Sequence, residues 1–377
     1  MTLATWTEKQ LGEICNIYTG NSINEQVKQK KYSNLSSGYN YIATKDIDFS
    51  SKIDYENGVK IPLKEPGFKI APKNSTLLCI EGGSAGRKIA FTSQDICFVN
   101  KLCAFVSDNN VLNGKFLFYF LQSPSFKRIF SDKVTGLIGG VSTSKLKSIS
   151  IVYPSLSEQQ QIVEKLDALF ADIEKEKQIA QKNLQNAKEL FESGIQKLCL
   201  NSCGDNVVKV GDILSLEYGK ALERQQRSET GKYLVYGANG PIGRTDQYLC
   251  EGKTIIVGRK GSVGEIVVAL ENNWPVDVTY WVKFDSNLYD FDFLYYLLRG
   301  LKLQSMAKGV KPGLNRNDVY ALKVHVPQSI NEQRNIAQKL NKLHEQTQKL
   351  EQIYTQQIAD LDELKQAILK KAFNGEL

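Results

Sequence analysis

The chain has 377 residues, of which 42% are hydrophobic and 24% are charged, and it carries 48 Lys and Arg against 41 Asp and Glu. That length exceeds what one ordinary hydrophobic core needs, so we expect two or three domains. No run approaches the ~20 apolar residues that cross a membrane, and residues 1–20 lack the basic start and apolar stretch of a secretion signal. The composition favours a soluble, cytoplasmic protein without membrane attachment.

Metal and disulfide chemistry are not expected. The seven cysteines are scattered and never spaced Cys-x-x-Cys, and only two histidines, His325 and His344, accompany them. This set lacks the ligand spacing of a structural zinc site. We interpret the cysteines as free thiols of a reducing compartment.

The positive charge falls in two separate blocks. Residues 1–155 carry a net charge of +7 and residues 206–328 carry +3, whereas residues 156–205 carry −3 and residues 329–377 are neutral. Phosphate-facing surfaces are expected in the two basic blocks, because lysine and arginine attract a polyanion. An excess of this size permits DNA binding without requiring it.

In chain order, each half begins with short β-rich runs punctuated by glycine and asparagine, which is typical of strands in mostly antiparallel sheets. A short segment that is apolar on every side follows in each half and predicts a buried helix. The predicted strands are residues 75–80, 97–106, 254–257 and 278–284, and the predicted short helices are residues 116–121 and 293–298.

Each half ends in a long predicted helix. From Glu158 to about Leu198 there is no proline, and a similar stretch follows Pro327. Apolar residues recur at alternating steps of four and three, which predicts a narrow seam for one partner helix. We expect Ser157 and Asn331 to be the N-caps. The predicted seam, or subunit interface, consists of Ile162, Leu166, Leu169, Ile173, Leu184, Phe191, Ile336, Leu340, Leu343, Leu350, Leu361, Leu364 and Ile368.

The two halves match each other in order, at an offset close to 175 residues over most of the length, which indicates a tandem duplication. Each helix would be ~60 Å long. Burying the two seams against each other predicts an α+β tandem repeat of two mixed α/β domains, each followed by a long helix. The helices would form an antiparallel coiled coil with pseudo-two-fold symmetry. The alternative is that each helix folds back on its own domain.

A duplicated basic domain with a spacer suits a bipartite site on duplex DNA, where half-sites lie about one helical turn, ~34 Å, apart. The stretches that we expect to form loops differ between the halves, as at residues 21–38 and 223–232, so the two domains would read different half-sites.

The chain has no phosphate-binding Gly-x-x-x-x-Gly-Lys loop and no Asn/Asp-Pro-Pro-aromatic motif of an adenine methyltransferase. Residues 237–243 and 258–264 lack the Gly-x-Gly-x-x-Gly spacing of a dinucleotide site, and we interpret them as turns.

The sequence resembles the specificity subunits of Type I restriction-modification enzymes over essentially its whole length. The resemblance rests on Glu-Gln-x-x-Ile, shortly after a proline and directly before a long helix, at residues 158–162 and 332–336. It also rests on Arg-Lys-Gly-Ser-x-Gly at residues 259–264 and on the stretch 236–243. In the first half the basic pair Arg87 and Lys88 follows the glycine turn rather than preceding it.

The resemblance implies target-recognition domain 1 at residues 1–155, a conserved helix at 156–204, target-recognition domain 2 at 205–328 and a second conserved helix at 329–377. It implies a non-catalytic DNA-recognition subunit that reads a bipartite asymmetric target on double-stranded DNA. Its partners would be two modification (methyltransferase) subunits and two restriction subunits. No cofactor is expected in this chain, since S-adenosylmethionine, ATP and magnesium would bind the partner subunits.

Base readout favours Arg, Lys and Asn, and phosphate contacts favour Lys and Arg. The turn-borne candidates for DNA binding are Lys45, Arg87, Lys88, Lys145, Asn239, Arg244, Arg259, Lys260, Lys311, Asn315 and Arg316. For each of these the alternative is a solvated surface charge. For the whole chain, the alternatives are a coiled-coil scaffold with protein-binding end domains and a fragment of a combined methyltransferase-specificity enzyme.

Overall fold

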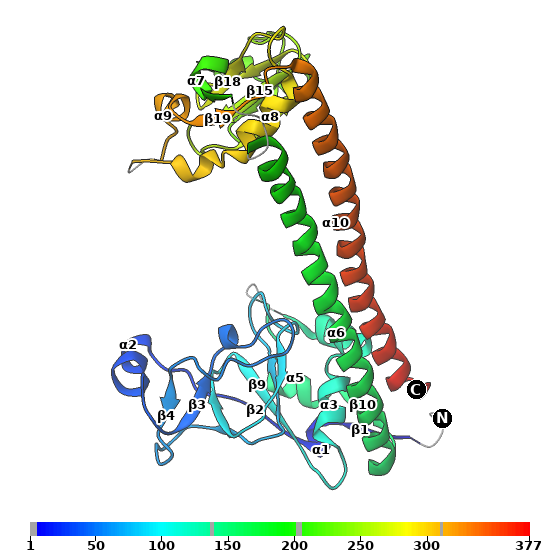
Figure 1. The fold of residues 1–377 in the computed structure, drawn as a ribbon. Coiled ribbons are helices and arrows are strands. Elements are labelled where there is room, and N and C mark those ends of the chain that lie inside the picture. The colour runs from blue at the N-terminus through cyan, green and yellow to red at the C-terminus, as the bar shows by residue number, and fades with distance from the viewer. Residues whose placement is uncertain (1–5, 136–138, 201–205, 310–311) are drawn as a thin grey trace. The chain divides into compact units, whose positions relative to one another are not determined.

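The structure is a computed structural model that describes residues 6–135, 139–200, 206–309 and 312–377. The chain divides into two compact units, Met1–Ile179 with Gln357–Leu377 (unit 1) and Ala180–Gln356 (unit 2). Each unit contains one sheet-rich domain and one stretch of each of the two long helices (Figure 1). The long helices are α6 (Leu156–Ile195), which continues into a π-helical turn at Gln196–Leu200, and α10 (Ile330–Phe373).

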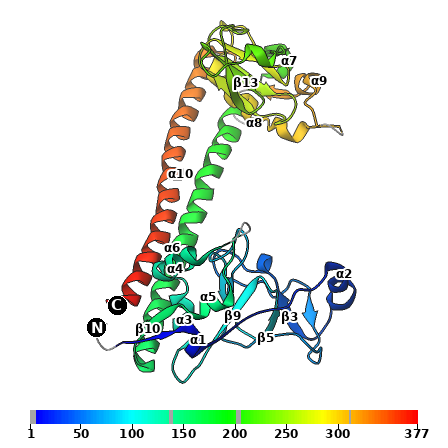
Figure 2. The same cartoon turned by 180° about the vertical axis from the view of Figure 1, so that it is seen from behind.

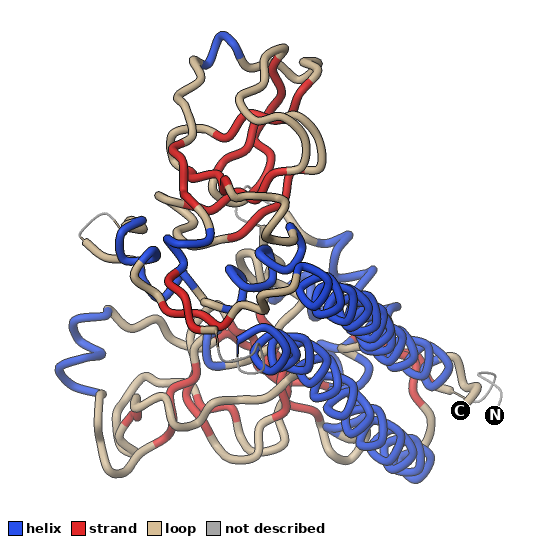
Figure 3. Tube along the Cα trace, turned by 45° about the horizontal axis from the view of Figure 1, so that its top comes forward, coloured by secondary structure: helices blue, strands red, loops and turns tan. Residues whose placement is uncertain are grey.

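Unit 1 is built on two four-stranded sheets and one strand pair (Figure 3). The first sheet is antiparallel and has the order β2-β9-β6-β7, and the second has the order β4-β3-β8-β5 with a parallel β3–β8 pair. The pair β1–β10 joins the start of the domain to the strand that precedes α6. The strands are β1 (Thr7–Gln10), β2 (Cys15–Thr19), β3 (Tyr39–Ile42), β4 (Lys60–Ile61), β5 (Ile70–Ala71), β6 (Thr76–Cys79), β7 (Ile89–Phe91), β8 (Ile96–Phe98), β9 (Leu102–Ser107) and β10 (Ser150–Tyr153).

Short helices of unit 1 cover the first sheet and meet the long helices. The side chain of Asn113 caps α3 by accepting from the backbone N–H groups of Lys115 and Phe116, and Ser123 caps α4 ahead of a proline at the first helical position. Seen from behind, α3 and α4 lie beside the first part of α6 (Figure 2). The helices are α1 (Leu11–Ile14), α2 (Glu25–Val27), α3 (Gly114–Phe120), α4 (Pro124–Lys133) and α5 (Thr143–Lys147), with a π turn at Lys28–Tyr32 and a 3₁₀ turn at Thr44–Asp46.

Unit 2 repeats this plan. Its four-stranded sheet β12-β18-β15-β16 corresponds in order and direction to β2-β9-β6-β7, and β11–β19 corresponds to β1–β10. A smaller sheet, β14-β13-β17, replaces the second sheet and keeps one parallel pair. The strands are β11 (Val207–Lys209), β12 (Ser215–Tyr218), β13 (Tyr233–Gly237), β14 (Gly240–Thr245), β15 (Thr254–Gly258), β16 (Ile266–Ala269), β17 (Asn273–Pro275), β18 (Thr279–Lys283) and β19 (Lys323–His325).

The helices of unit 2 repeat three of those of unit 1. α7 (Val210–Ile213), α8 (Phe291–Gly300) and α9 (Arg316–Tyr320) correspond to α1, α3 and α5, whereas α4 is replaced by a 3₁₀ turn at Leu303–Met306. A further 3₁₀ turn lies at Arg224–Gln226. The predicted short buried helices are therefore confirmed as α3 and α8, and the predicted tandem α+β architecture is confirmed.

Two details differ from the sequence prediction. The predicted strand at residues 97–106 is two strands in different sheets, because the chain turns at Val99–Leu102, where the N–H of Leu102 donates to the carbonyl of Val99. The long helices begin at Leu156 and Ile330, so Ser157 and Asn331 lie in the first turn rather than at the N-cap. The hydroxyl of Ser155 accepts from the N–H of Glu158 and occupies the capping position of α6.

One buried glutamine at the start of each long helix joins that helix to its domain. In unit 1 the side chain of Gln159 accepts from the backbone N–H of Asn113 at 2.8 Å and donates to the carbonyls of Val111 and Pro154 at 3.0 and 2.9 Å. The glutamine of the Glu-Gln signature thus reaches the N-cap of the buried helix and the proline before its own helix. All of its partners are backbone groups.

Unit 2 contains the same glutamine clamp. Gln333 accepts from the backbone N–H of Asp290 at 2.8 Å and donates to the carbonyls of Leu288 and Pro327 at 3.1 and 2.9 Å. Buried amide groups are stable only when they find such partners. The Glu-Gln signature is therefore a structural device that fixes where each long helix leaves its domain.

Within each unit the two long helices pack antiparallel. In unit 1, Lys365 lies over the ring of Phe170 and Asp362 pairs with Lys177 at 2.6 Å, so the residue numbers fall along α10 as they rise along α6. In unit 2, the rings of Phe191 and His344 lie 4.5 Å apart. A Cβ on Gly194 would lie 2.3 Å from a terminal methyl group of Leu343, so the helices approach closely there and a larger residue would displace the Leu343 side chain.

The predicted seam residues are not all enclosed. Leu169 is 39% exposed and Leu364 is 47% exposed, because Phe170 and Lys365, one position along each helix, take the facing positions. An α-helix of 3.6 residues per turn drifts against a strict 3.5-residue repeat, which accounts for this shift. Ile162, Leu166, Ile173, Phe191 and Leu340 are buried, and Leu184, Ile336, Leu343, Leu350, Leu361 and Ile368 are partly buried.

Candidate nucleic-acid interface

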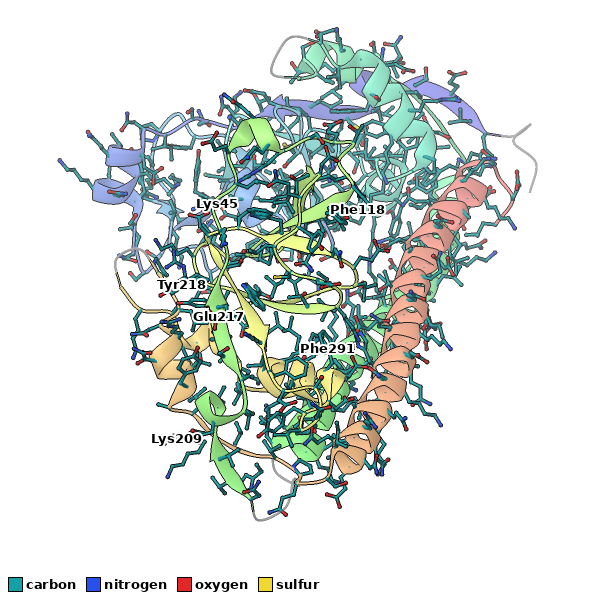
Figure 4. The ribbon with its side chains drawn as sticks, turned by 90° about the horizontal axis from the view of Figure 1, so that it is seen from above. Lys45, Phe118, Lys209, Glu217, Tyr218 and Phe291 are labelled. Atoms are coloured by element: carbon teal, nitrogen blue, oxygen red, sulfur yellow. The ribbon has the colours of Figure 1, made fainter. Side chains whose placement is uncertain are left out.

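In unit 2, three elements bring two arginines against one exposed aromatic ring. Tyr218 is the last residue of β12 and is 47% exposed (Figure 4). The guanidinium carbon of Arg259, from the β15–β16 turn, lies 5.2 Å from the centre of its ring, and that of Arg316, the first residue of α9, lies 4.9 Å away. Cation–π contact of this kind holds a guanidinium group in place while its N–H groups stay available for other acceptors.

Backbone contacts fix this aromatic–arginine cluster to the sheet. The N–H of Arg259 donates to the carbonyl of Val278 at 2.9 Å, and its carbonyl accepts from Leu314 at 2.9 Å. A terminal nitrogen of Arg316 donates to the carbonyl of Leu216 at 3.4 Å. The Nε of Arg259 is buried and has no acceptor among the described residues, so a bound ligand could supply one.

Unit 1 carries a different cluster at the equivalent β6–β7 turn. Phe49 is 64% exposed, and the charged groups of Arg87 and Lys88 lie 5.0 and 5.2 Å from the centre of its ring. Lys88 also donates to the carbonyl of Thr44 at 3.0 Å. The exposed Lys45, labelled in Figure 4, follows Thr44 in the same 3₁₀ turn. Together with the contacts of Phe49, this brings three of the predicted cations to one region.

The loop that presents Phe49 is shaped by the preceding aspartate. The carboxylate of Asp48 accepts from the backbone N–H groups of Ser50 and Lys52 at 2.9 and 2.8 Å and from the hydroxyl of Ser50 at 2.8 Å. Burial raises the pKa of Asp48, but these hydrogen bonds outweigh it and hold the pKa below its ordinary value. The loop is therefore ordered without help from a ligand.

Glycines at both turns allow the chain to pack closely. Gly86 and Gly264 have φ of +71° and +75°. A Cβ on Gly264 would come within 2.4 Å of the backbone of Leu303 and Gln304, and one on Gly86 would come within 2.7 Å of the ring of Phe130. Both turns are thus pressed against the segment that follows the short buried helix, which fixes where their arginines emerge.

Three predicted DNA-binding residues hold loops of their own unit instead of pointing freely outward. Lys145 donates to the carbonyl of Lys133 and the hydroxyl of Thr135 at 3.2 and 3.1 Å. Arg244 donates to the carbonyls of Gly231 and Lys232 at 2.5 and 3.1 Å. The side chain of Asn315 caps α9. These contacts give the three side chains a structural role within their own unit, which differs from the solvated surface charge that the sequence left open as the alternative.

The other predicted residues lie at exposed positions or outside the described chain. Asn239 is exposed in the β13–β14 hairpin, and Lys260 is exposed in the β15–β16 turn beside Arg259. Lys311 lies outside the described residues. Sequence reasoning did not select Phe49 or Tyr218, because it searched for charged and amide side chains. The sequence signal that could have pointed to them is an aromatic residue flanked by polar and turn-forming residues.

The described residues offer little for metal or nucleophilic chemistry. Among them, no group of three or more His, Cys, Asp or Glu could hold a metal ion. Burial raises the pKa of Cys15, Cys103 and Cys250 to about 12, so these thiols stay protonated. Within the same residues, no helix combines the length and apolar character needed to cross a membrane.

A duplicated basic module that presents arginine beside an exposed ring in each copy has the features of a nucleic-acid recognition protein. The family comparison identifies the class: the family model described as "Type I restriction modification DNA specificity domain" matches residues 4–182 and again residues 205–359. The chain belongs to this family. It is a DNA specificity subunit of a type I restriction-modification system, and the domain family is non-catalytic.

Individual relatives agree with this family. A protein of Mycoplasma genitalium named as a type I specificity subunit is 26% identical over 353 residues, which cover 85% of this chain and 86% of the relative. A chain from a structure of a type I restriction-modification system superposes with a TM-score of 0.82 at 19% identity and 99% coverage of both chains. The HsdS subunit of Thermoanaerobacter tengcongensis gives 0.59 at 19% identity, covering 100% of this chain and 98% of that one. At these identities the structural matches show the fold.

Proposed function

We propose that this specificity subunit reads an asymmetric, bipartite DNA target, with one half-site contacted by each sheet-rich domain. The observation that supports this proposal is the pair of unlike clusters at equivalent turns. The β6–β7 turn presents Arg87 and Lys88 beside Phe49, and the β15–β16 turn presents Arg259, with Arg316 from α9, beside Tyr218. One scaffold with two different sets of donors would select two different base sequences.

Within each proposed recognition site the arginines would read bases, because an arginine fork matches the two acceptors of guanine in the major groove. Lys45, Lys88 and Lys260 would contact phosphates, and Asn239 would approach a base or the backbone from its hairpin. Lys145, Arg244 and Asn315 would act indirectly, since their side chains support the loops. Lys311 remains a candidate on its sequence position alone.

For the whole chain we propose the division into recognition domain 1 (1–155), helix 1 (156–204), recognition domain 2 (205–328) and helix 2 (329–377). The exposed leucines of the predicted seam, Leu169 and Leu364, would contact partner subunits. In the assembled enzyme one copy of this chain would act in the cytoplasm with two methyltransferase subunits and two restriction subunits. S-adenosylmethionine would bind the former, and ATP with magnesium the latter.

The test is to map methylated adenines across the genome of a host that carries this subunit with its methyltransferase partners. We expect one motif made of two different short sequences separated by a fixed gap. Exchanging residues 1–155 for those of a relative should replace one of the two sequences and leave the other unchanged. A single continuous motif, or a motif in which both sequences change together, would contradict the proposal.

A further inference from the structure

A cleft of about 650 Å³ lies within unit 1 between the recognition loops and the long helices. Phe49 and Arg87 line it on the recognition side, Lys127 of α4 lies at one wall, and Lys177 and Lys365 come from α6 and α10. The cleft is open to solvent, its lining is polar and apolar in about equal measure, and the residues that line it come from five separate segments of the chain. Its size is within the range of small-molecule and phosphate-bearing ligand sites.

The cations of the cleft are not fully compensated. Lys177 pairs with Asp362 at 2.6 Å, and the carboxylate of Asp48 is occupied by its own loop. Lys127 instead donates to the neutral side chain of Gln366 at 2.8 Å, and Lys365 lies over the ring of Phe170. In the part of the chain that the structure describes, neither Lys127 nor Lys365 forms an ion pair, and the acidic groups of the lining that act on Lys365 are Glu174 and Asp362.

Burial and proximity make these two charges costly. Burial lowers the pKa of Lys127, and the charge of Lys365 lowers it further. Burial also lowers the pKa of Lys365, an effect that Glu174 and Asp362 partly oppose. Two amines that repel each other in one cleft gain the most from an anion placed between them.

The duplicated half provides an internal comparison. The contact of Phe170 with Lys365 corresponds to that of His344 with Phe191, because each joins α6 and α10 beside the short buried helix of its unit. The residue after Lys365 on α10 is Gln366, and the residue after Phe191 on α6 is Glu192, so Gln366 of unit 1 corresponds to Glu192 of unit 2. Glu192 pairs with Arg299 at 3.2 Å. Arg299, the cation that contacts Glu192 in unit 2, thus has a carboxylate partner, whereas Lys127, which contacts Gln366 in unit 1, has only an amide partner.

We infer that the cleft of unit 1 binds a phosphate group between Lys127 and Lys365, with Arg87 at its rim. The inference rests on the proposed function, because the favoured source of the phosphate is the backbone of the bound DNA. Arg87 and Phe49 belong both to the cleft and to the proposed recognition cluster, so a strand that reaches this cluster passes the mouth of the cleft. A free phosphate-bearing ion is the second source, and the experiment separates the two.

The test compares the complex of this full chain and its methyltransferase subunits with a variant that carries Lys127→Gln and Lys365→Gln. Affinity for the target duplex is measured by fluorescence anisotropy over a range of salt concentrations. Each phosphate whose contact is lost should reduce the slope of log K against log [salt] by about 0.9, so we expect a reduction of about 0.9 for the double variant, which loses one phosphate. Discrimination between the target and altered half-sites should stay unchanged, since phosphates carry no sequence information.

Two control variants make the comparison specific. Lys175→Gln with Lys370→Gln removes the same charge from exposed positions of α6 and α10 outside the lining of the cleft, and its slope should stay close to that of the wild type. Lys127→Arg with Lys365→Arg keeps the charge and should keep the slope. A second arm follows stabilisation of each protein by inorganic phosphate at constant ionic strength.

The outcomes are distinct. A reduced slope in the glutamine variant alone supports a DNA-backbone phosphate. An unchanged slope with loss of inorganic-phosphate stabilisation supports a free ion at the same site. If neither measurement separates the cleft variant from its charge-matched control, the inference is wrong. Failure of the wild-type complex to prefer its mapped target would instead overturn the proposed function, and the inorganic-phosphate arm would still test the cleft.

Discussion

Replacing Tyr218 by leucine isolates the role of the exposed ring in unit 2. The ring is 47% exposed and contacts both Arg259 and Arg316, so its loss should leave the core intact while both guanidinium groups lose their support. Leucine keeps an apolar side chain of moderate size but offers no π face. We therefore expect normal folding together with weaker binding at the second half-site.

The size of the effect follows from the two contacts. Each cation–π contact at an exposed position contributes ~0.5–1 kcal/mol, and each arginine released from the ring costs ~0.5–1.5 kcal/mol to order again on binding. The cation–π contacts exist in the free protein as well as in the complex, so only the ordering cost of the two arginines counts, and the variant should lose about 1–3 kcal/mol of binding free energy, or ~5- to 150-fold in affinity. Arg316 also donates a hydrogen bond to the carbonyl of Leu216, which holds its side chain when the ring is absent. We therefore expect a loss of affinity toward the lower end of this range.

The assay is a fluorescence anisotropy titration of the assembled complex with three duplexes: the mapped target, and two versions in which one half-site is scrambled. Phe49→Leu is the matched control, because Phe49 supports Arg87 and Lys88 in unit 1. Tyr218→Leu should reduce the contribution of the second half-site alone, and Phe49→Leu that of the first alone. Equal losses on both half-sites, or no loss with either variant, would refute the assignment of these rings.

Replacing Arg259 and Lys260 together by alanine should weaken binding at the second half-site with unchanged thermal unfolding; filter binding that shows wild-type affinity and salt dependence would count against this. Leu340→Ala removes a fully buried helix residue and should lower the free energy of unfolding in urea by ~2–5 kcal/mol. Leu364→Ala, at a 47% exposed position, should change it by ~0.5 kcal/mol or less. Burial lowers the pKa of His344 from its ordinary 6.5, so the folded state favours the neutral ring. The stability linked to this shift is present above pH 6.5 and is lost as the pH falls through the lower pKa of the folded state. His344→Phe should flatten that part of the profile of Tm against pH, and an unaltered profile would exclude His344 as its source.

The parts of the fold that depend on periodic patterns could be predicted from the sequence. The repeated segments predicted a duplication, and the proline-free apolar periodicity predicted both long helices because a helix seam leaves a regular signal. The exact facing residues could not be predicted, since a one-residue drift exchanges Leu169 for Phe170. The break at Val99–Leu102 was also hidden, because two apolar strands separated by a tight turn resemble one long strand.

The candidate site was less predictable than the fold. The choice of turn-borne basic residues stays a prediction, and composition alone could not separate Arg259, which contacts an exposed ring, from Arg244, which is occupied by two carbonyl groups. The cleft was not predicted at all. Its lysines, Lys127 and Lys365, come from positions more than 200 residues apart, and only the packing of α10 against α4 brings them together.

The glutamine clamps have a consequence for how such subunits change their specificity. The side-chain hydrogen bonds of Gln159 and Gln333 described above all go to backbone groups. Hydrogen bonds of this kind do not depend on the side chains of the recognition loops, so a domain with different loops that keeps the residues packed against the helix can be joined to the same helix. Recombination at the two junctions would then exchange domains as cassettes, and a host could acquire a new combination of half-sites in one genetic event while the mechanical frame of the subunit stays the same.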